Sequence, residues 1–330
     1  MTRFNALVTR KLPSSVLDKL SAIADIDVYV GEAAIPYDEL RARIAGCHAL
    51  VSLLTDKVDR AVIDSAPDLK VISNVAVGFN NIDVAHARSR GIVVTNTPDV
   101  LSESVADFTW ALILSITRRL SEGERLVRSG QWKGWAFDLL LGSELRGKQL
   151  GLVGVGRIGR AVATRASAFG MQVAYTGRVG APAGTAAGTE VRPDPRVPAG
   201  AELMSFDRLL VTSDIVSLHV PLTAETTHLI DKRALARMKR SAYLINTARG
   251  PVVDEAALAW ALQQNLLAGA ALDVYEHEPT VHPDLFGLEN VLLVPHLASG
   301  TTETRTAMAD LAVNNAIAVM TGRPPLTPVP

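Results

Sequence analysis

The stretch Gly154-Val155-Gly156-Arg157-Ile158-Gly159 decides the fold of this chain. It follows an apolar run, Gln149–Val153, and it opens a helical pattern. In such a strand–turn–helix setting Gly154 permits a tight turn, Gly156 leaves room for a pyrophosphate, and Gly159 lets the helix pack closely on the strand. The amino end of the helix adds N–H groups and partial positive charge. The stretch therefore predicts a Rossmann unit that binds a dinucleotide through Gly154, Gly156, Arg157, Ile158 and Gly159.

Strand-like and helical runs alternate on both sides of this turn. The runs before it are Ala6–Thr9, Asp27–Val30, Ala49–Leu53, Lys70–Asn74 and Ile92–Thr95. The series that starts at the turn's own strand comprises Gln149–Val153, Gln172–Tyr175, Ile215–His219, Ala242–Asn246, Ala270–Val274 and Val291–Val294. Alternation of this kind implies parallel sheets joined by right-handed crossovers. We therefore predict the α/β class, with two doubly wound parallel-sheet domains: a Rossmann cofactor domain and a flavodoxin-like substrate domain.

The domain boundaries are predicted from the same pattern. Residues 1–98 and 298–330 are assigned to the substrate-binding domain, and residues 99–297 to the dinucleotide-binding domain. One long helix is predicted from about Ser102 to Ser129, with a length that suits a connection between domains. A helix over Thr301–Met320 has no sheet of its own, so we expect it to fold back onto the first domain.

Composition excludes several classes of function. The 330 residues carry a formal net charge of −1 with no block of like charge, which argues against a nucleic-acid surface and a polybasic membrane patch. A single cysteine, Cys47, excludes an internal disulfide framework, and no His/Asp/Glu cluster has metal-ligand spacing. Met1–Arg10 lacks the long apolar run of a secretory signal, so we expect a cytoplasmic protein without metal.

The residues after the second strand of the Rossmann unit bear on the choice of cofactor. An NAD-binding unit carries an acidic residue there for the ribose 2′-hydroxyl, but this chain reads Thr176-Gly177-Arg178. A carboxylate would repel a 2′-phosphate, whereas an arginine pairs with one. The sequence therefore favours NADPH over NADH, although Arg178 as a solvated residue, with both cofactors accepted, stays open. The Gly-, Ala- and Pro-rich segment Gly180–Gly200 is expected to be a surface loop.

Side chains that could bind a ligand or transfer a proton lie at the ends of the later strands of this sheet. They are His219 with Val220 and Pro221, Arg249 after Thr247 and Ala248, Asp273, and His296. Ligands of open α/β sheets bind at the carboxyl ends of the strands, so these groups should converge. Arg249 can bind a carboxylate with two hydrogen bonds, and His296 suits a reversible proton donor. Glu278 is available to orient the imidazole, so the set predicts reduction of a 2-oxo acid.

At these residues the sequence resembles the D-isomer-specific 2-hydroxyacid dehydrogenases, and within them the glyoxylate/hydroxypyruvate reductases. The resemblance covers nearly the whole chain. The motifs that carry the resemblance are the turn Gly154–Gly159, called the glycine turn below, and Ile245-Asn246-Thr247-Ala248-Arg249-Gly250, Leu272-Asp273-Val274, Glu278-Pro279 and Pro295-His296. The resemblance implies that His296 is the acid/base, Glu278 its carboxylate partner, and Arg249 the group that binds the substrate and polarises its carbonyl.

The resemblance also implies further site residues. Asp273 would hold the nicotinamide carboxamide, and the segment around His219, Val220 and Pro221 would line the cofactor with Thr247 and Ala248. The loops that carry Leu53 and Val77-Gly78 would bind the substrate, the latter through backbone N–H groups. Many relatives have Asp in place of Asn80 in that second loop. Trp135 lies on an apolar arm that in similar enzymes reaches the neighbouring subunit and closes its pocket, so a homodimer is expected.

The main hypothesis is thus NADPH-preferring reduction of glyoxylate to glycolate and of hydroxypyruvate to D-glycerate. A dehydrogenase for a larger or phosphorylated acid, such as 3-phosphoglycerate, is the first alternative. Leu53 and Val77 are apolar, and Lys57 is the one cation near them in the sequence, which disfavours a phosphorylated substrate. A cofactor-sensing binding protein, like the corepressors that share this fold, is the second alternative. The complete Arg/Glu/His set argues against it.

Overall fold

Five parallel strands form the sheet of the first structural unit, which comprises Met1–Leu101 and Gly300–Pro330. The computed structural model describes residues 3–177 and 194–330. The strands of this unit are β1 (Phe4–Val8), β2 (Ala24–Val28), β3 (Ala49–Ser52), β4 (Val71–Asn74) and β5 (Val93–Thr95). Their order in the sheet is β2-β1-β3-β4-β5, which is the flavodoxin-like order of a doubly wound fold. The prediction for this domain's fold is confirmed.

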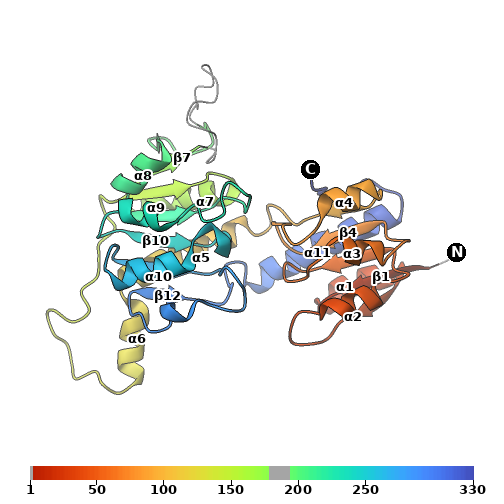
Figure 1. The fold of residues 1–330 in the computed structure, drawn as a ribbon, viewed down its shortest axis with the longest axis horizontal. Coiled ribbons are helices and arrows are strands. Elements are labelled where there is room, and N and C mark those ends of the chain that lie inside the picture. Colours follow the sequence, from red (N-terminus) through yellow and green to blue (C-terminus); the bar gives the residue numbers. More distant parts are fainter. Residues whose placement is uncertain (1–2, 178–193) are drawn as a thin grey trace. The chain divides into compact units, whose positions relative to one another are not determined.

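Helices cover both faces of this sheet (Figure 1). They are α1 (Ser14–Ser21), α2 (Tyr37–Arg43), α3 (Arg60–Asp64), α4 (Val84–Ser89) and α11 (Thr302–Met320). The helices α2 to α4 pack on the face that presents Leu7, Leu50 and Ile72. Helix α11 contacts α1, β3 and β4, and the hydroxyl of Ser73 donates to the carbonyl of Ala312 at 2.7 Å. The expectation that the C-terminal helix returns to the first unit is therefore correct.

The second unit, Ser102–Ser299, contains a seven-stranded parallel sheet. Its strands are β6 (Gln149–Val153), β7 (Gln172–Thr176), β8 (Glu202–Leu203), β9 (Ile215–Leu218), β10 (Tyr243–Asn246), β11 (Gly269–Leu272) and β12 (Val291–Leu293). The order is β12-β11-β10-β9-β6-β7-β8, so the direction of winding reverses between β6 and β9. This is the Rossmann topology, and its ligand crevice lies at that reversal. The two-residue strand β8 is an addition to the predicted set.

Two apolar layers sandwich the second sheet, because its strands are buried on both faces. The helices are α5 (Ser102–Thr117), α6 (Leu120–Arg128), α7 (Arg157–Ala166), α8 (Phe206–Thr212), α9 (Lys232–Arg237) and α10 (Glu255–Gln263), with 3₁₀ turns at Ser167–Phe169, Gly250–Val252 and Pro283–Leu285. Leu152 joins the core beneath α5 and α7, whereas its neighbour Val153 joins the core beneath α8 to α10. The period of two along the strand thus divides the side chains between the layers.

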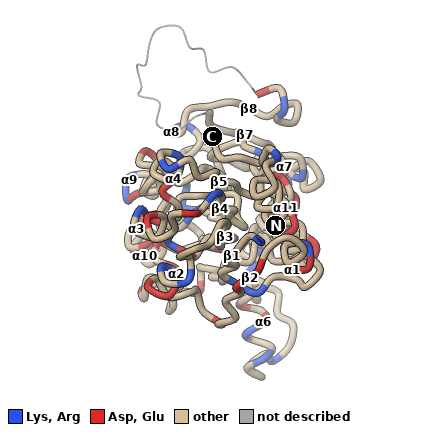
Figure 2. The backbone as a smooth tube through the Cα atoms, turned by 90° about the vertical axis from the view of Figure 1, so that its right-hand side faces the viewer, with Lys and Arg blue, Asp and Glu red and all other residues tan. Residues whose placement is uncertain are grey.

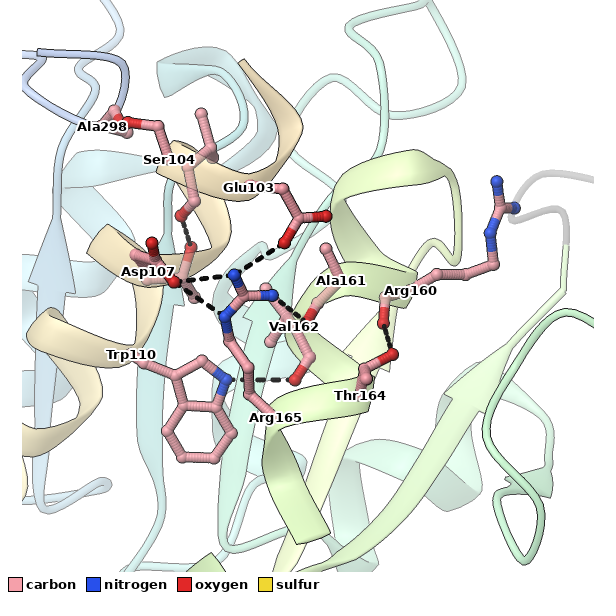
Figure 3. Close-up of polar contacts among 12 residues, drawn as sticks. Glu103, Ser104, Asp107, Trp110, Arg160, Ala161, Val162, Thr164, Arg165 and Ala298 are labelled. Carbon is pink, nitrogen blue, oxygen red and sulfur yellow. Dashed lines mark hydrogen bonds and ion pairs between the residues drawn. The ribbon is translucent and has the colours of Figure 1, made fainter. Parts of the chain in front are cut away.

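Helix α5 holds the helix of the glycine turn in place (Figure 3). The indole Nε1 of Trp110 donates to the carbonyl of Val162 at 3.0 Å. Arg165 forms ion pairs with Glu103 and Asp107, both at 2.7 Å. These contacts join α5 to α7 along one face, so the turn that precedes α7 rests on a fixed support.

The prediction of one long helix from Ser102 to Ser129 is wrong, because the structure has two helices there. Helix α5 ends at Thr117, and Arg119 adopts a left-handed conformation with φ of 53°. The carbonyl of Thr117 accepts the N–H of Ser143 at 2.8 Å, a partner from the returning chain. This tertiary hydrogen bond caps α5 and lets α6 leave in a new direction.

Charged residues of both signs are interspersed along the described chain (Figure 2). This agrees with the formal net charge of −1. Within residues 3–177 and 194–330, the structure has no helix with the length and apolar character needed to cross a membrane.

Candidate active site

The glycine turn has the geometry that a dinucleotide pyrophosphate requires. Gly154 has φ of +96°, and a Cβ on it would lie 2.8 Å from the carbonyl oxygen of His219. A Cβ on Gly159 would lie 2.3 Å from the carbonyl oxygen of Gly154, so the helix packs against the turn as predicted. In contrast, a Cβ on Gly156 would meet nothing within 4 Å. The turn thus keeps open space beside Gly156 at the amino end of α7, where a phosphate is stabilised.

The end of β7 offers a second feature that fits a dinucleotide. Thr176 is buried, and its hydroxyl has no hydrogen-bond partner within the described residues. A buried unpaired hydroxyl is costly unless a ligand or water satisfies it. The next residue, Gly177, is not the acidic residue that an NAD-binding unit carries near this point. Arg178 and residues 180–193 of the predicted surface loop lie outside the described residues. The end of β7, with Thr176 and Gly177, can therefore accommodate the adenosine part of a dinucleotide.

His219 borders the glycine turn directly after β9. Its N–H donates to the carbonyl of Val153 at 2.8 Å, and its Nε2 lies 2.9 Å from the hydroxyl of Ser217. Burial lowers the pKa of His219 to about 4, so the ring is neutral at pH 7. Val220 is buried beside Gly154, and the carbonyl of Pro221 accepts the hydroxyl of Thr226 at 2.7 Å. This segment lines the turn but supplies no charged group.

Arg249 leaves the sheet at the end of β10 in a turn that Asn246 closes. The amide of Asn246 donates to the carbonyl of Arg249 and accepts the N–H of Ala248, both at 3.0 Å. Thr247 meets the hydroxyl of Thr109 on α5 at 3.0 Å. Burial lowers the pKa of Arg249 and the charge of Glu278 opposes this, but a guanidinium remains charged at neutral pH. The role of Asn246 was not predicted, although its place in an Asn-x-x-Arg turn was visible.

Asp273 is fully buried at the end of β11 and holds the chain that follows β12. Its Oδ1 accepts the N–H of Leu297 at 2.6 Å, and its Oδ2 accepts that of Ala298 at 3.0 Å. Its own carbonyl accepts the N–H of His296 at 2.9 Å. Burial raises the pKa of Asp273 despite these hydrogen bonds. The carboxylate therefore orients the backbone around His296, and its expected contact with a carboxamide stays a prediction.

His296 and Glu278 form the central pair of the site. The imidazole Nδ1 lies 2.9 Å from Oε2 of Glu278, and the two side chains are 25% and 28% exposed. The other oxygen of Glu278 accepts the N–H of Tyr275 at 3.1 Å. Burial alone would raise the pKa of Glu278, but His296, the Tyr275 N–H and the charge of Arg249 together lower it. Glu278 is thus an ionised carboxylate that orients an accessible imidazole.

Close packing of two loops brings Arg249 to this pair. Gly250 lies against the backbone of Tyr275 so tightly that any Cβ there would overlap it. The segment from Tyr275 to Glu278 therefore runs beside the turn that carries Arg249, which explains the electrostatic effect of each charge on the other. The structure brings together all three predicted catalytic residues within one unit.

The predicted substrate-binding residues of the first unit lie in two loops after β3 and β4. The N–H of Leu53 donates to Oδ2 of Asp56 at 2.7 Å. Within the described part of the chain, the N–H groups of Val77 and Gly78 donate no hydrogen bond. These two groups are consequently available to an anionic ligand.

Trp135 lies on the segment between α6 and β6, outside any helix or strand. Trp135 is 83% exposed, and Phe137 is 84% exposed. The exposed apolar side chains of α6 and this segment are Leu120, Val127, Trp132, Trp135, Phe137, Leu139 and Leu141. The unit itself therefore does not bury this arm.

A cavity of about 590 Å³ lies at the opposite, amino ends of β10 to β12. Arg119, Tyr243 and Asn290 are among its lining residues, and none of the candidate catalytic residues is. We therefore place the candidate active site at the carboxyl ends of the strands, where the catalytic side chains lie, and not in this cavity. Among residues 3–177 and 194–330, no group of three or more His, Cys, Asp or Glu side chains could hold a metal ion.

Comparison with known proteins agrees with this geometry. Residues 110–298 match the family described as D-isomer specific 2-hydroxyacid dehydrogenase, NAD binding domain. The glyoxylate reductase of Thermofilum pendens is 48% identical over 330 residues, covering 98% of this chain and 94% of the relative.

Two crystal structures extend the likeness. A protein of Thermus thermophilus has a TM-score of 0.90 and 44% identity, covering 99% of this chain and 100% of that one. The NADPH-dependent glyoxylate/hydroxypyruvate reductase of Sinorhizobium meliloti, in complex with NADP and malonate, has a TM-score of 0.86 and 36% identity, covering 99% of this chain and 97% of its own. The chain therefore belongs to the D-isomer-specific 2-hydroxyacid dehydrogenases, a family of NAD(P)-dependent oxidoreductases.

Proposed function

We propose that this protein reduces glyoxylate to glycolate and hydroxypyruvate to D-glycerate, with NADPH preferred and NADH as the alternative cofactor. The observation that carries the proposal is the 2.9 Å contact between His296 and Glu278 beside the charge of Arg249. The glyoxylate reductase names of relatives such as that of Thermofilum pendens support the substrate class. The absence of a carboxylate at Thr176-Gly177-Arg178 supports NADPH.

Each residue of the set has a role that follows from its charge. When bound, the reduced nicotinamide supplies a hydride to the carbonyl carbon of the substrate. His296 donates a proton to the carbonyl oxygen, and Glu278 stabilises the charged imidazole and fixes its orientation. Arg249 binds the carboxylate and polarises the carbonyl, because a guanidinium offers two parallel donors. Asp273 holds the backbone next to His296.

The two units take different parts of the ligand in this proposal. The unit Ser102–Ser299 binds the dinucleotide through the glycine turn, Thr176, Thr247 and the segment at His219. The other unit contributes the N–H groups of Val77 and Gly78 and the loop of Leu53 to the substrate. This division is supported by the open space at Gly156 and by the N–H groups of Val77 and Gly78, which donate no hydrogen bond within residues 3–177 and 194–330.

A homodimer is part of the proposal. The exposed arm, with Trp135 and Phe137 83% and 84% exposed, is apolar surface that a second copy would cover. In that assembly Trp135 would close the substrate pocket of the partner. We also propose that the protein works in the cytoplasm, which suits a chain with a single cysteine, Cys47.

The test is a steady-state assay of the purified protein with glyoxylate and hydroxypyruvate, each with NADPH and with NADH. We expect turnover of both acids, formation of the D isomer of glycerate, and a higher kcat/KM with NADPH. The variant His296→Gln is the control for chemistry at this site. Negligible turnover of both acids with either cofactor, by a folded protein that binds NADPH, would exclude the proposed substrates.

A further inference from the structure

Two successive peptide groups in the loop after β4, residues 75–83, have their carbonyl oxygens held by asparagine side chains. Nδ2 of Asn96 donates to the carbonyl of Val77 at 2.7 Å. Nδ2 of Asn74 donates to the carbonyl of Gly78 at 2.9 Å. A trans peptide directs its N–H away from its carbonyl, so the N–H groups of Gly78 and Phe79 point away from these amides.

These N–H groups remain available. Within the described residues neither the N–H of Gly78 nor that of Phe79 donates a hydrogen bond. Backbone N–H groups that donate to no acceptor within the protein can donate to a bound anion. Because their carbonyls are fixed by side chains, little conformational entropy is lost when an anion binds.

A third asparagine joins this loop to the loop after β3. Oδ1 of Asn81 accepts Nδ2 of Asn74 at 3.3 Å. Nδ2 of Asn81 donates to the carbonyls of Leu53 at 3.1 Å and Asp56 at 3.0 Å. The hydroxyl of Ser52 in turn donates to Oδ1 of Asn74 at 3.2 Å. One connected set of amides thus fixes both loops.

Burial adds to the restraint at Asn74. Asn74 is fully buried, and the buried Asp56 accepts the hydroxyl of Thr9 at 2.5 Å and the N–H of Leu53 at 2.7 Å. A buried amide that loses its partner costs about 1–3 kcal/mol, so the Asn74 side chain is held to its partners. Asn81 and Asn96 are half-buried and act through the hydrogen bonds given above.

We propose that Asn74, Asn81 and Asn96 are positioning residues that direct the N–H groups of Gly78 and Phe79 toward the carboxylate of the substrate. The N–H of Phe79 is accordingly a donor in addition to those of Val77 and Gly78. The inference rests on the proposed function, because it takes the ligand of this loop to be the carboxylate of a 2-oxo acid.

The first test is the isosteric variant Asn96→Asp in the full-length protein. It removes the donor to Val77 and places a carboxylate oxygen opposite that carbonyl, so the peptide should rotate. We expect the KM for glyoxylate and the inhibition constant of oxamate, an unreactive 2-oxo acid analogue, to rise about 10-fold. The value of kcat and the Kd of NADPH should stay within about twofold of wild type, since the glycine turn belongs to the other unit. Loss of fold would instead lower all of these together.

A matched control for charge is Asn96→Ser, which removes the donor to Val77 without adding a carboxylate. We expect it to raise the KM as Asn96→Asp does, so that an orientation effect is separated from a charge effect. The second variant, Asn81→Asp, tests the link to the Leu53 loop, and it should also raise the KM. If either charged variant unfolds, Asn96→Ser and Asn81→Ser remove the donors without adding charge.

The outcomes separate this inference from the proposed function. If wild type reduces glyoxylate and the folded Asn96 and Asn81 variants keep its KM and oxamate affinity, the positioning role is wrong and the function stands. If wild type fails to reduce glyoxylate but binds oxamate, and the Asn96 variant weakens that binding, the function is wrong and the positioning role stands. If wild type neither reduces glyoxylate nor binds oxamate, both are wrong.

Discussion

Nδ1 of His296 lies 2.9 Å from Oε2 of Glu278, a residue 18 positions earlier in the chain. The backbone of His296 is in the left-handed region, with φ of 53°, and its N–H is held by the carbonyl of Asp273. The carboxylate of Asp273 fixes the next two N–H groups. The imidazole is thus oriented by one carboxylate at its ring and by another through its backbone.

Removing the charge from Glu278 should lower the rate more than the affinity. The variant Glu278→Gln keeps the shape of the side chain but no longer stabilises a charged imidazole. We expect kcat for glyoxylate to fall about 10- to 100-fold, and His296→Gln to reduce it about 100-fold or more. Steady-state kinetics with NADPH binding as the control measure this. A kcat within about twofold of wild type for Glu278→Gln would remove the carboxylate from the mechanism.

Two alanine substitutions in the glycine turn should separate binding from folding. Gly156→Ala meets no atom within 4 Å, so we expect its unfolding free energy to change by less than about 1 kcal/mol while NADPH affinity falls about 10-fold or more. Gly159→Ala places a Cβ 2.3 Å from the carbonyl oxygen of Gly154, so both stability and affinity should fall. Urea unfolding and NADPH titration test the pair. Unchanged NADPH affinity in Gly156→Ala would contradict pyrophosphate binding at this turn.

Much of the fold was predictable because parallel strands are buried on both faces and appear as short apolar runs. The strand Gln149–Val153 was predicted with its observed bounds. The strand β8 (Glu202–Leu203) was missed because two residues carry no periodic signal. The break before α6 was missed for a different reason. It depends on a hydrogen bond from Ser143 to Thr117, and local helix propensity contains no information about it.

The same distinction applies to the site. Arg249, Glu278 and His296 were predicted because their types and spacings carry the chemistry, and the structure brings them together. The asparagines Asn74 and Asn81 were missed, since an amide acts only through partners that the fold supplies. For Asp273 the family resemblance implied a contact with the cofactor, which stays a prediction. Its hydrogen bonds to the N–H groups of Leu297 and Ala298 were missed, because they depend on how the fold places the chain after β12.

Arg178 provides the test of cofactor preference. If its guanidinium pairs with the 2′-phosphate, Arg178→Ala should lower kcat/KM with NADPH about 10- to 100-fold and leave kcat/KM with NADH unchanged. Substituting an arginine of the same unit that pairs with an acidic side chain away from the glycine turn, Arg237→Ala, controls for the loss of positive charge. Equal losses with both cofactors in Arg178→Ala would show that the residue does not discriminate between them.

His219 should make the second unit sensitive to acid. Its pKa falls from an ordinary value near 6.5 to about 4 in the folded protein, so below pH 6.5 the unfolded chain binds a proton that the folded chain does not. Stability is therefore lost as the pH falls from about 6.5 to about 4, by at most about 3 kcal/mol. His219→Asn should reduce the loss between pH 7 and pH 5 by up to about 2 kcal/mol in urea unfolding. Ser217→Ala leaves the imidazole buried, so this variant should lose as much stability between pH 7 and pH 5 as wild type does. An unchanged pH dependence in His219→Asn would assign the acid sensitivity to other groups.

Trp135 allows a test of the dimer that also reports on the site. If its indole closes the pocket of the partner subunit, Trp135→Ala should lower kcat/KM for glyoxylate without changing NADPH affinity. Mixing Trp135→Ala with the inactive His296→Gln should then restore activity. In the mixed dimer one pocket has an intact His296 from the first chain and an intact Trp135 from the second. Light scattering of each variant would confirm that the dimer persists. If Trp135 acts within its own chain, or the protein is a monomer, mixing gives no recovery, because no chain then has both side chains in one site.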